Sequence, residues 1–128
     1  MATEILINDG GAPARILPFI AGSAIAAGDP VTMANGDNEV DTVSAANVKV
    51  LGYSLTAATS GTMANIITGH GVMLNASVSG ALVSGGAALA TDALGYLVDN
   101  AGGHQGHTVA IALETGTATT GLKKVLTL

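Results

Sequence analysis

The sequence contains no cysteine and no tryptophan, and only 2% of its 128 residues are aromatic. The absence of cysteine excludes disulfide bonds and thiolate metal sites, and it leaves the redox compartment of the protein open. Sugar-binding surfaces usually present exposed aromatic rings, and this chain has only Phe19, Tyr53 and Tyr96 to offer. The shortage of aromatic rings therefore disfavours a glycan-binding role.

Charged residues are also scarce, at 10% of the chain, and most of them are acidic. The formal net charge is −5, and the four basic residues are scattered along the sequence: Arg15, Lys49, Lys123 and Lys124. A surface that binds nucleic acid needs a concentration of positive charge. The composition therefore argues against a nucleic-acid partner.

Long apolar runs of the kind that cross membranes are missing as well. No charged residue occurs between Lys49 and Asp92, but glycine, asparagine, serine and threonine repeatedly interrupt this interval. The first ten residues (MATEILINDG) lack the basic start and the apolar core of a secretion signal. We therefore expect no membrane partner and no secretion signal.

Alanine and glycine are abundant, with 23 and 18 residues, in a chain of single-domain length. Alanine inflates the hydrophobic fraction of 48%, although its burial removes little apolar area from water. Glycine increases the entropy that is lost on folding. Our hypothesis is that association, with itself or with a larger surface, supplies much of the stability. A dilute monomer with a sharp melting transition would contradict it.

Two apolar clusters, residues 5–7 and 16–20, flank the turn-rich residues 8–13. The prolines in this region favour extended backbone over helix. We interpret residues 1–20 as an extended N-terminal arm and residues 21–128 as a β-barrel domain. The alternative is that the apolar clusters form the first strand of the barrel.

The remainder of the chain contains an internal repeat. Its two copies span about residues 22–75 and 79–128, with an offset of roughly 57–58 positions. Residues 50–55 (VLGYSL) correspond to residues 108–113 (TVAIAL), where apolar residues alternate with a period of two. Short strands separated by turns, without sustained helical periodicity, are typical of sandwiches and barrels. The predicted fold is all-β: a small β-barrel or β-tulip built from two similar half-repeats, with an extended N-terminal arm.

These half-repeats resemble the capsid cement, or head decoration, proteins of tailed bacteriophages. The resemblance is carried by residues 25–31 (IAAGDPV), 50–55 (VLGYSL) and 109–114 (VAIALE), and it covers roughly residues 20–128. The second copy departs from the pattern in two places: Gly86-Ala87 stands for Asp29-Pro30, and Ala110 stands for Gly52.

The resemblance implies a structural protein of the virion, synthesised in the host cytoplasm, without enzymatic activity or a cofactor. It implies a homotrimer, or alternatively a dimer, on the outer surface of an icosahedral head. There the protein would stabilise contacts between major capsid proteins after the shell expands. An N-terminal arm commonly makes part of the capsid contact in this family. The candidate contact residues here are Ile5, Leu6, Ile7, Arg15, Ile16, Leu17, Phe19 and Ile20.

Other chemistries find little support in the sequence. His104 and His107, with His70 as a third ligand, would need to converge to bind zinc, and their glycine-rich surroundings favour a solvated loop. The acidic residues 37–41 lack the spacing of an EF-hand calcium loop. There is no Gly-x-Ser-x-Gly nucleophile elbow and no phosphate-binding loop. We therefore predict neither catalytic residues nor a metal site.

The sequence is also compatible with two functions other than that of a decoration protein. One is a virion-surface or tail-associated β module that binds a host or a glycan, and a glycan screen would detect it. The other is a small hydrolase that uses the histidines. It would require an activity that is lost on His104→Ala and His107→Ala.

Overall fold

The computed structural model describes residues 5–8, 15–45, 48–79, 88–92, 94–99, 108–114 and 121–128. These residues form eleven β-strands and no helix. None of them therefore lies in a helix long and apolar enough to cross a membrane. The strands are β1 Leu6–Asn8, β2 Arg15–Ala21, β3 Pro30–Met33, β4 Glu39–Thr42, β5 Gly52–Ser54, β6 Met63–Thr68, β7 Met73–Val78, β8 Ala88–Thr91, β9 Leu97–Asp99, β10 Ala110–Ala112 and β11 Gly121–Thr127.

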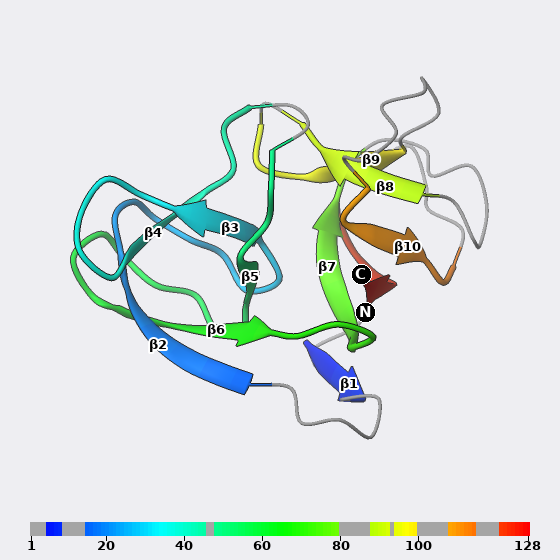
Figure 1. Ribbon diagram of the computed structural model, residues 1–128, viewed down its shortest axis with the longest axis horizontal. Helices are drawn as coiled ribbons and strands as arrows, with labels where there is room; N and C mark the ends of the chain where they lie inside the picture. The colour runs from blue at the N-terminus through cyan, green and yellow to red at the C-terminus, as the bar shows by residue number, and fades with distance from the viewer. Residues whose placement is uncertain are drawn as a thin grey trace.

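The strands close into two barrels that lie side by side (Figure 1). The first barrel has the strand order β2-β4-β3-β5-β6, and β6 returns to pair with β2. The second is a sheet in the order β7-β11-β10-β8-β9, which closes because β9 also pairs with β7. Strand β1 pairs antiparallel with the first residues of β7. The all-β prediction is confirmed.

The two barrels repeat the same topology, which confirms the prediction of two similar halves. Each strand from β2 to β6 has its counterpart roughly 58 positions later, from β7 to β11. Each ring contains one parallel pair, β2 with β4 and β7 with β9, while its other pairs are antiparallel. Each half-repeat therefore forms its own barrel, and β2 and β7 are the equivalent opening strands.

This equivalence moves the start of each half one strand earlier than the sequence suggested. We expected the first copy to end at about residue 75, but residues 73–75 belong to β7, which opens the second barrel. In the same way β2 opens the first barrel and spans the expected boundary between arm and domain at residue 20. The difference arises because the sequence pattern shows strands but not their pairing partners.

The buried apolar residues form two clusters. The first barrel encloses a small one, centred on Val31, Val40 and Ile66. The larger cluster fills the second barrel with residues such as Leu74, Leu89 and Leu97, and it also includes Tyr53 and Ile67 of the first barrel. Tyr53 and Ile67 are direct cross-strand partners on β5 and β6, so their side chains lie on the same face. That face packs against the second barrel and joins the two cores.

A turn at residues 26–29 makes a second connection between the barrels. The backbone carbonyl of Gly28 accepts a hydrogen bond from the backbone N–H of Ser77 at 2.9 Å. The Ser77 hydroxyl donates to Oδ1 of Asp29 at 2.7 Å. The other carboxylate oxygen, Oδ2, accepts from the backbone N–H of Ala26 at 3.0 Å and holds the turn itself. Asp29 therefore fixes the turn and ties it to β7.

We expect Asp29→Ala to lower the free energy of unfolding by about 1.5–3 kcal/mol, because hydrogen bonds to a charged group contribute in this range. Urea unfolding followed by circular dichroism measures the effect. Asp37→Ala is the matched control, since Asp37 is exposed and belongs to a hairpin of the same barrel. Equal unfolding midpoints for the two variants would show that the Asp29 bonds contribute nothing to stability.

Candidate functional site

The outer face of β2 is apolar where it meets β6. Direct partners in this antiparallel pair share a face, and Leu17 and Phe19 lie opposite Ile66 and Ala64, which are buried inside the barrel. The alternate residues of β2 therefore point outward. We define the outer stripe as the three outward residues of β2 and the partner of the last one on β6: Ile16, Pro18, Ile20 and Met63.

The outer stripe is open to solvent. Ile16 is 45% exposed, Ile20 44% and Met63 67%, and Pro18 is also exposed. The outward positions of a solvated antiparallel sheet are usually polar, so three large apolar side chains there are unusual. Contiguous exposed apolar residues of this kind mark interaction surfaces. The outer stripe is a candidate contact surface for another protein.

Strand β2 also has a free backbone edge. It pairs with β4 only at Ile20 and Ala21, and no strand of the described chain pairs with residues 15–19 on that side. The N–H of Ile20 points to this side, where it donates to the Asn38 carbonyl, so the alternation of the backbone places Pro18 on the same side. Pro18 has no N–H, and its position at the free edge costs the barrel no ladder bond. A strand added here would also lack that bond, which favours contact through side chains.

The structure places the predicted contact residues in two groups. Ile5 is buried in the larger cluster, and Leu6 pairs with Leu74 through β1, so only Ile7 of this group is exposed. Residues 15–20 lie in β2, where they form the first strand of a barrel, as the alternative interpretation had it. Arg15, Ile16, Leu17 and Ile20 are exposed, and Phe19 is half-buried. Their contact with a capsid stays a prediction.

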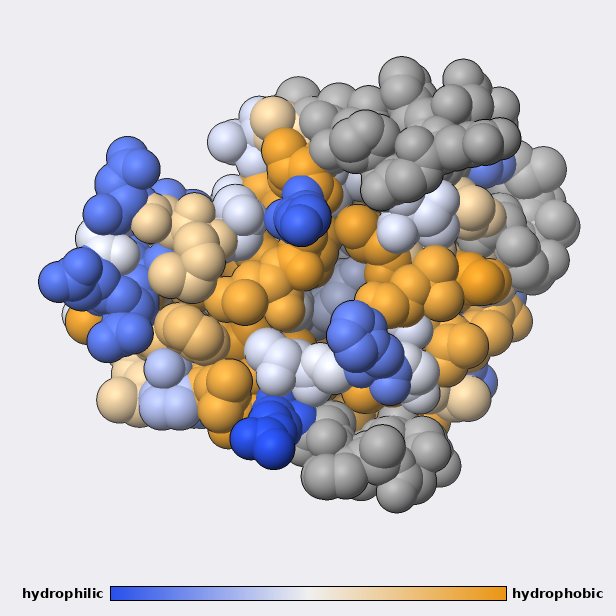
Figure 2. All heavy atoms as spheres, in the orientation of Figure 1, coloured by the Kyte–Doolittle hydropathy of each residue, from blue (hydrophilic) through white to orange (hydrophobic). Residues whose placement is uncertain are grey.

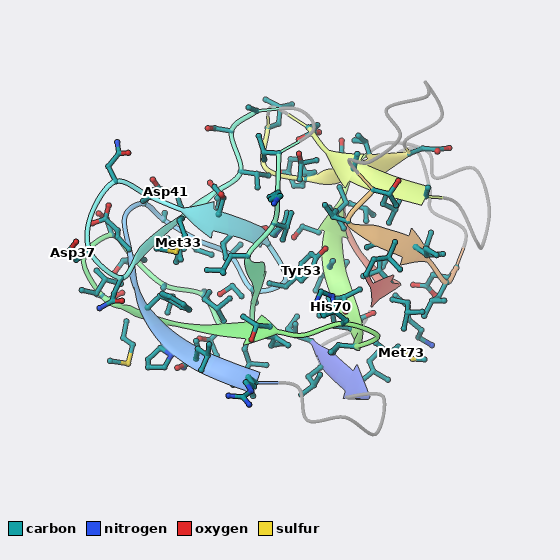
Figure 3. All side chains as sticks on the ribbon, in the orientation of Figure 1. Met33, Asp37, Asp41, Tyr53, His70 and Met73 are labelled. Carbon is teal, nitrogen blue, oxygen red and sulfur yellow. The ribbon has the colours of Figure 1, made fainter. Side chains whose placement is uncertain are left out.

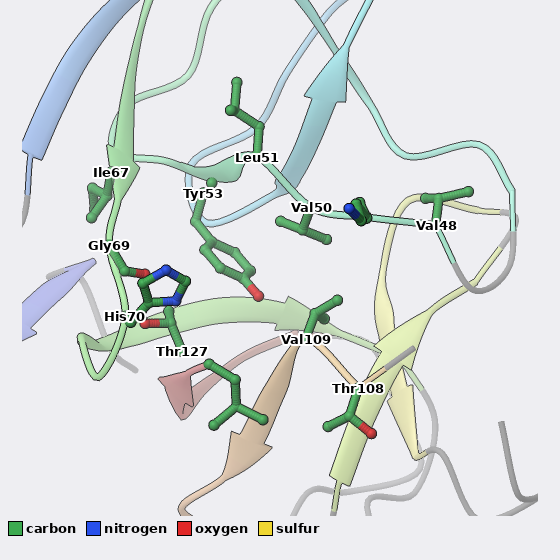
Figure 4. A pocket seen from close by; sticks show the side chains of 13 residues that line it. Val48, Val50, Leu51, Tyr53, Ile67, Gly69, His70, Thr108, Val109 and Thr127 are labelled. Atoms are coloured by element: carbon green, nitrogen blue, oxygen red, sulfur yellow. Dashed lines mark hydrogen bonds between the residues drawn. The ribbon is translucent and has the colours of Figure 1, made fainter. Parts of the chain in front are cut away.

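A pocket of about 310 Å³ lies between the two barrels. One wall comes from β5 and the segment before it, and the other comes from residues 108–109 and the end of β11 (Figure 4). Most of the lining is aliphatic, with Val50, Leu51 and Val109 among its residues. Among the described residues, its titratable side chains are Lys49, Tyr53 and His70.

The lining of this pocket includes a buried tyrosine, Tyr53. The side chain is 3% exposed, and its hydroxyl has no hydrogen-bond partner among the residues that the structure describes. Burial raises the pKa of the phenol above its ordinary value, so the hydroxyl keeps its proton. Tyr53 was not among the predicted site residues. Its rarity as one of three aromatic residues was the available hint, but the sequence did not show that the ring faces the junction of two barrels.

Of the three candidate zinc ligands, the structure describes only His70. His104 and His107 lie outside the described residues, and His70 is exposed at the pocket. Figure 3 shows Asp37 and Asp41 at the far end of the first barrel from His70. Oδ1 of Asp41 is buried without a partner, but within the described ranges no group of three acidic or histidine side chains is arranged to hold a metal ion.

Comparison with known proteins gives a structural match and no sequence match. No protein-family profile matches the chain, and a search of curated proteins finds no similar sequence. Among solved structures, the chain is similar to the N base of the head fiber gp8.5 of bacteriophage phi29. The TM-score is 0.73 at 14% sequence identity, and the match covers 91% of this chain and 95% of the other. The two-barrel fold is therefore one that a component of a bacteriophage head fiber also adopts.

Proposed function

We propose that this chain is a structural protein of a bacteriophage head, a decoration or cement subunit that binds the outside of the expanded shell. The observation that carries the proposal is the two-barrel fold, shared over nearly the whole of both chains with a protein of the phi29 head fiber. The proposed partner is the major capsid protein, and the proposed assembly is a homotrimer. The proposal includes no enzymatic step.

The outer stripe gives this proposal a physical basis. Burying large aliphatic side chains such as Ile16, Ile20 and Met63 contributes about 25 cal/mol for each Å² removed from water. A ligand that binds the expanded shell and not the unexpanded one shifts the equilibrium toward expansion. Many copies on one shell add their effects, so modest affinity at each site is sufficient.

Co-sedimentation with empty heads of the phage that encodes the chain tests the proposal. We expect the wild-type protein to sediment with expanded heads and not with unexpanded ones, and light scattering to give the mass of a trimer. Failure to bind expanded heads would overturn the proposed function.

A charge placed in the outer stripe tests the contact surface. Ile20→Asp should weaken binding to expanded heads about tenfold or more, because the contact would bury an unpaired carboxylate. Leu94→Asp is the matched control, since Leu94 is 78% exposed but lies in the turn between β8 and β9 of the other barrel. If both variants lose binding equally, or if neither loses binding, the outer stripe is not the contact.

A further inference from the structure

The pocket between the barrels opens on an apolar face of the molecule. In the space-filling view, residues of apolar type surround a hollow where the barrels meet, and hydrophilic residues stand on either side of it (Figure 2). A volume of about 310 Å³ is at the lower end of the range for small-molecule sites. The pocket belongs to neither barrel alone, because β5 and residues 108–109 both line it.

The charged side chain at this pocket has the opposite sign to the net charge of the chain. The protein carries nine acidic and four basic residues, with a net charge of −5. Among the described residues, the pocket lining nevertheless contains Lys49 and no aspartate or glutamate side chain, and the imidazole of His70 adds a group that can donate a hydrogen bond. Both Lys49 and His70 are exposed, so they stand where the pocket meets solvent. This distribution favours a ligand whose polar end is anionic.

The pocket also holds a donor without an acceptor. Thr127 is another polar residue of the lining, and its hydroxyl both donates and accepts a hydrogen bond. It donates to the Gly69 carbonyl at 3.1 Å and accepts from the Val72 N–H at 2.9 Å. Within the described part of the chain, the Tyr53 hydroxyl has no such partner. Figure 4 shows the Tyr53 side chain extending from β5 into the pocket, in a setting that includes His70 and Val109. A buried hydroxyl that makes no bond is unfavourable, and a ligand oxygen would satisfy it.

We propose that this pocket binds an aliphatic carboxylate. The alkyl chain lies against the aliphatic lining, which includes Val50, Leu51 and Val109, and the carboxylate lies toward Lys49 and His70. One carboxylate oxygen accepts the hydrogen bond of the Tyr53 hydroxyl. The hydroxyl is out of contact with solvent in the free protein, so the ligand reaches it through a small shift of the surrounding side chains. Head binding through the outer stripe is a separate property and does not depend on this site.

Calorimetric titration of the purified protein with three ligands tests the proposal. Octanoate should bind more than about a hundredfold more tightly than acetate, because each buried methylene contributes about 0.8 kcal/mol. Octylammonium has the same alkyl chain and the opposite charge, and we expect it to bind more weakly than octanoate. Equal affinities for octanoate and octylammonium, or no binding of octanoate, would overturn the proposal.

Two variants locate the bound carboxylate. Lys49→Met should weaken octanoate binding about two- to fivefold, as expected for the loss of one exposed charge pair, whereas Lys124→Met on β11 should leave the affinity unchanged. Tyr53→Phe should weaken it about tenfold, while the unfolding midpoint of the free protein stays the same or rises, because an unsatisfied hydroxyl is removed. Wild-type affinity in both Lys49→Met and Tyr53→Phe would refute the site.

Discussion

Gly52→Ala is expected to lower the free energy of unfolding by about 3 kcal/mol or more, at or above the upper end of the usual cost of overpacking. A Cβ atom at Gly52 would stand 2.3 Å from the backbone carbonyl oxygen of Ile67 and 2.7 Å from Cγ2 of Ile66. A backbone oxygen cannot rotate away, so β5 and β6 would have to separate. Folded domains are stable by only about 5–15 kcal/mol, and this chain has few large core residues. Urea unfolding measures the loss.

Gly121→Ala is the matched control for this prediction. Gly121 is also a strand residue, at the start of β11, but no atom of the described residues beyond its chain neighbours lies within 4 Å of the position that its Cβ would take. Neither glycine is among those with positive φ, so the comparison isolates the steric contact. The control should keep wild-type stability or gain slightly, because alanine has fewer conformations to lose on folding. A Gly52→Ala protein as stable as the control would contradict the close approach of β5 and β6.

Ile67→Ala is expected to lower the free energy of unfolding by about 2–5 kcal/mol, the range for truncating a large buried aliphatic side chain. Ile67 is 1% exposed and belongs to the first barrel, but it packs in the cluster that fills the second. The truncation would leave a cavity at the junction, beside its cross-strand partner Tyr53. Because the cluster draws residues from both barrels, we expect both to lose stability together. Amide hydrogen exchange followed residue by residue measures each barrel separately.

Ile16→Ala provides the comparison within the same strand pair. Ile16 lies directly opposite Ile67 on the outer face, yet it is 45% exposed and is not part of either core cluster. Its truncation should cost less than about 1 kcal/mol, since little apolar area returns to water. If Ile67→Ala destabilises only β2–β6 and leaves exchange in β7–β11 unchanged, the two barrels fold independently and the shared cluster does not couple them.

The prediction at Gly52 also accounts for a departure seen in the repeat. The second copy has Ala110 at the equivalent position, on β10, where it is fully buried. The same strand therefore tolerates a methyl group in the second barrel and not in the first, where β5 lies against the Ile67 carbonyl. Ala110→Gly should therefore lower the free energy of unfolding only slightly, whereas Gly52→Ala should lower it strongly.

Much of the fold could be predicted from the sequence. The alternation in residues 108–113, the correspondence with residues 50–55 and the offset between the copies all follow from the side-chain period of a strand. The role of residues 15–20 could not be predicted in this way. An apolar segment after a turn is equally suited to a free arm or to a barrel strand, and only its pairing with β6 places it in β2.

The sequence by itself determined an all-β chain of two similar halves, because strand periodicity, turn residues and repetition are local properties of the polypeptide. Tertiary structure decided that each half closes its own barrel, that Pro18 lies at a free edge and that Tyr53 faces the other barrel. It also decided which apolar residues remain exposed, as in the outer stripe, and which line the pocket. These properties depend on which strands become neighbours, and strand pairing joins residues far apart in the chain that no local pattern connects.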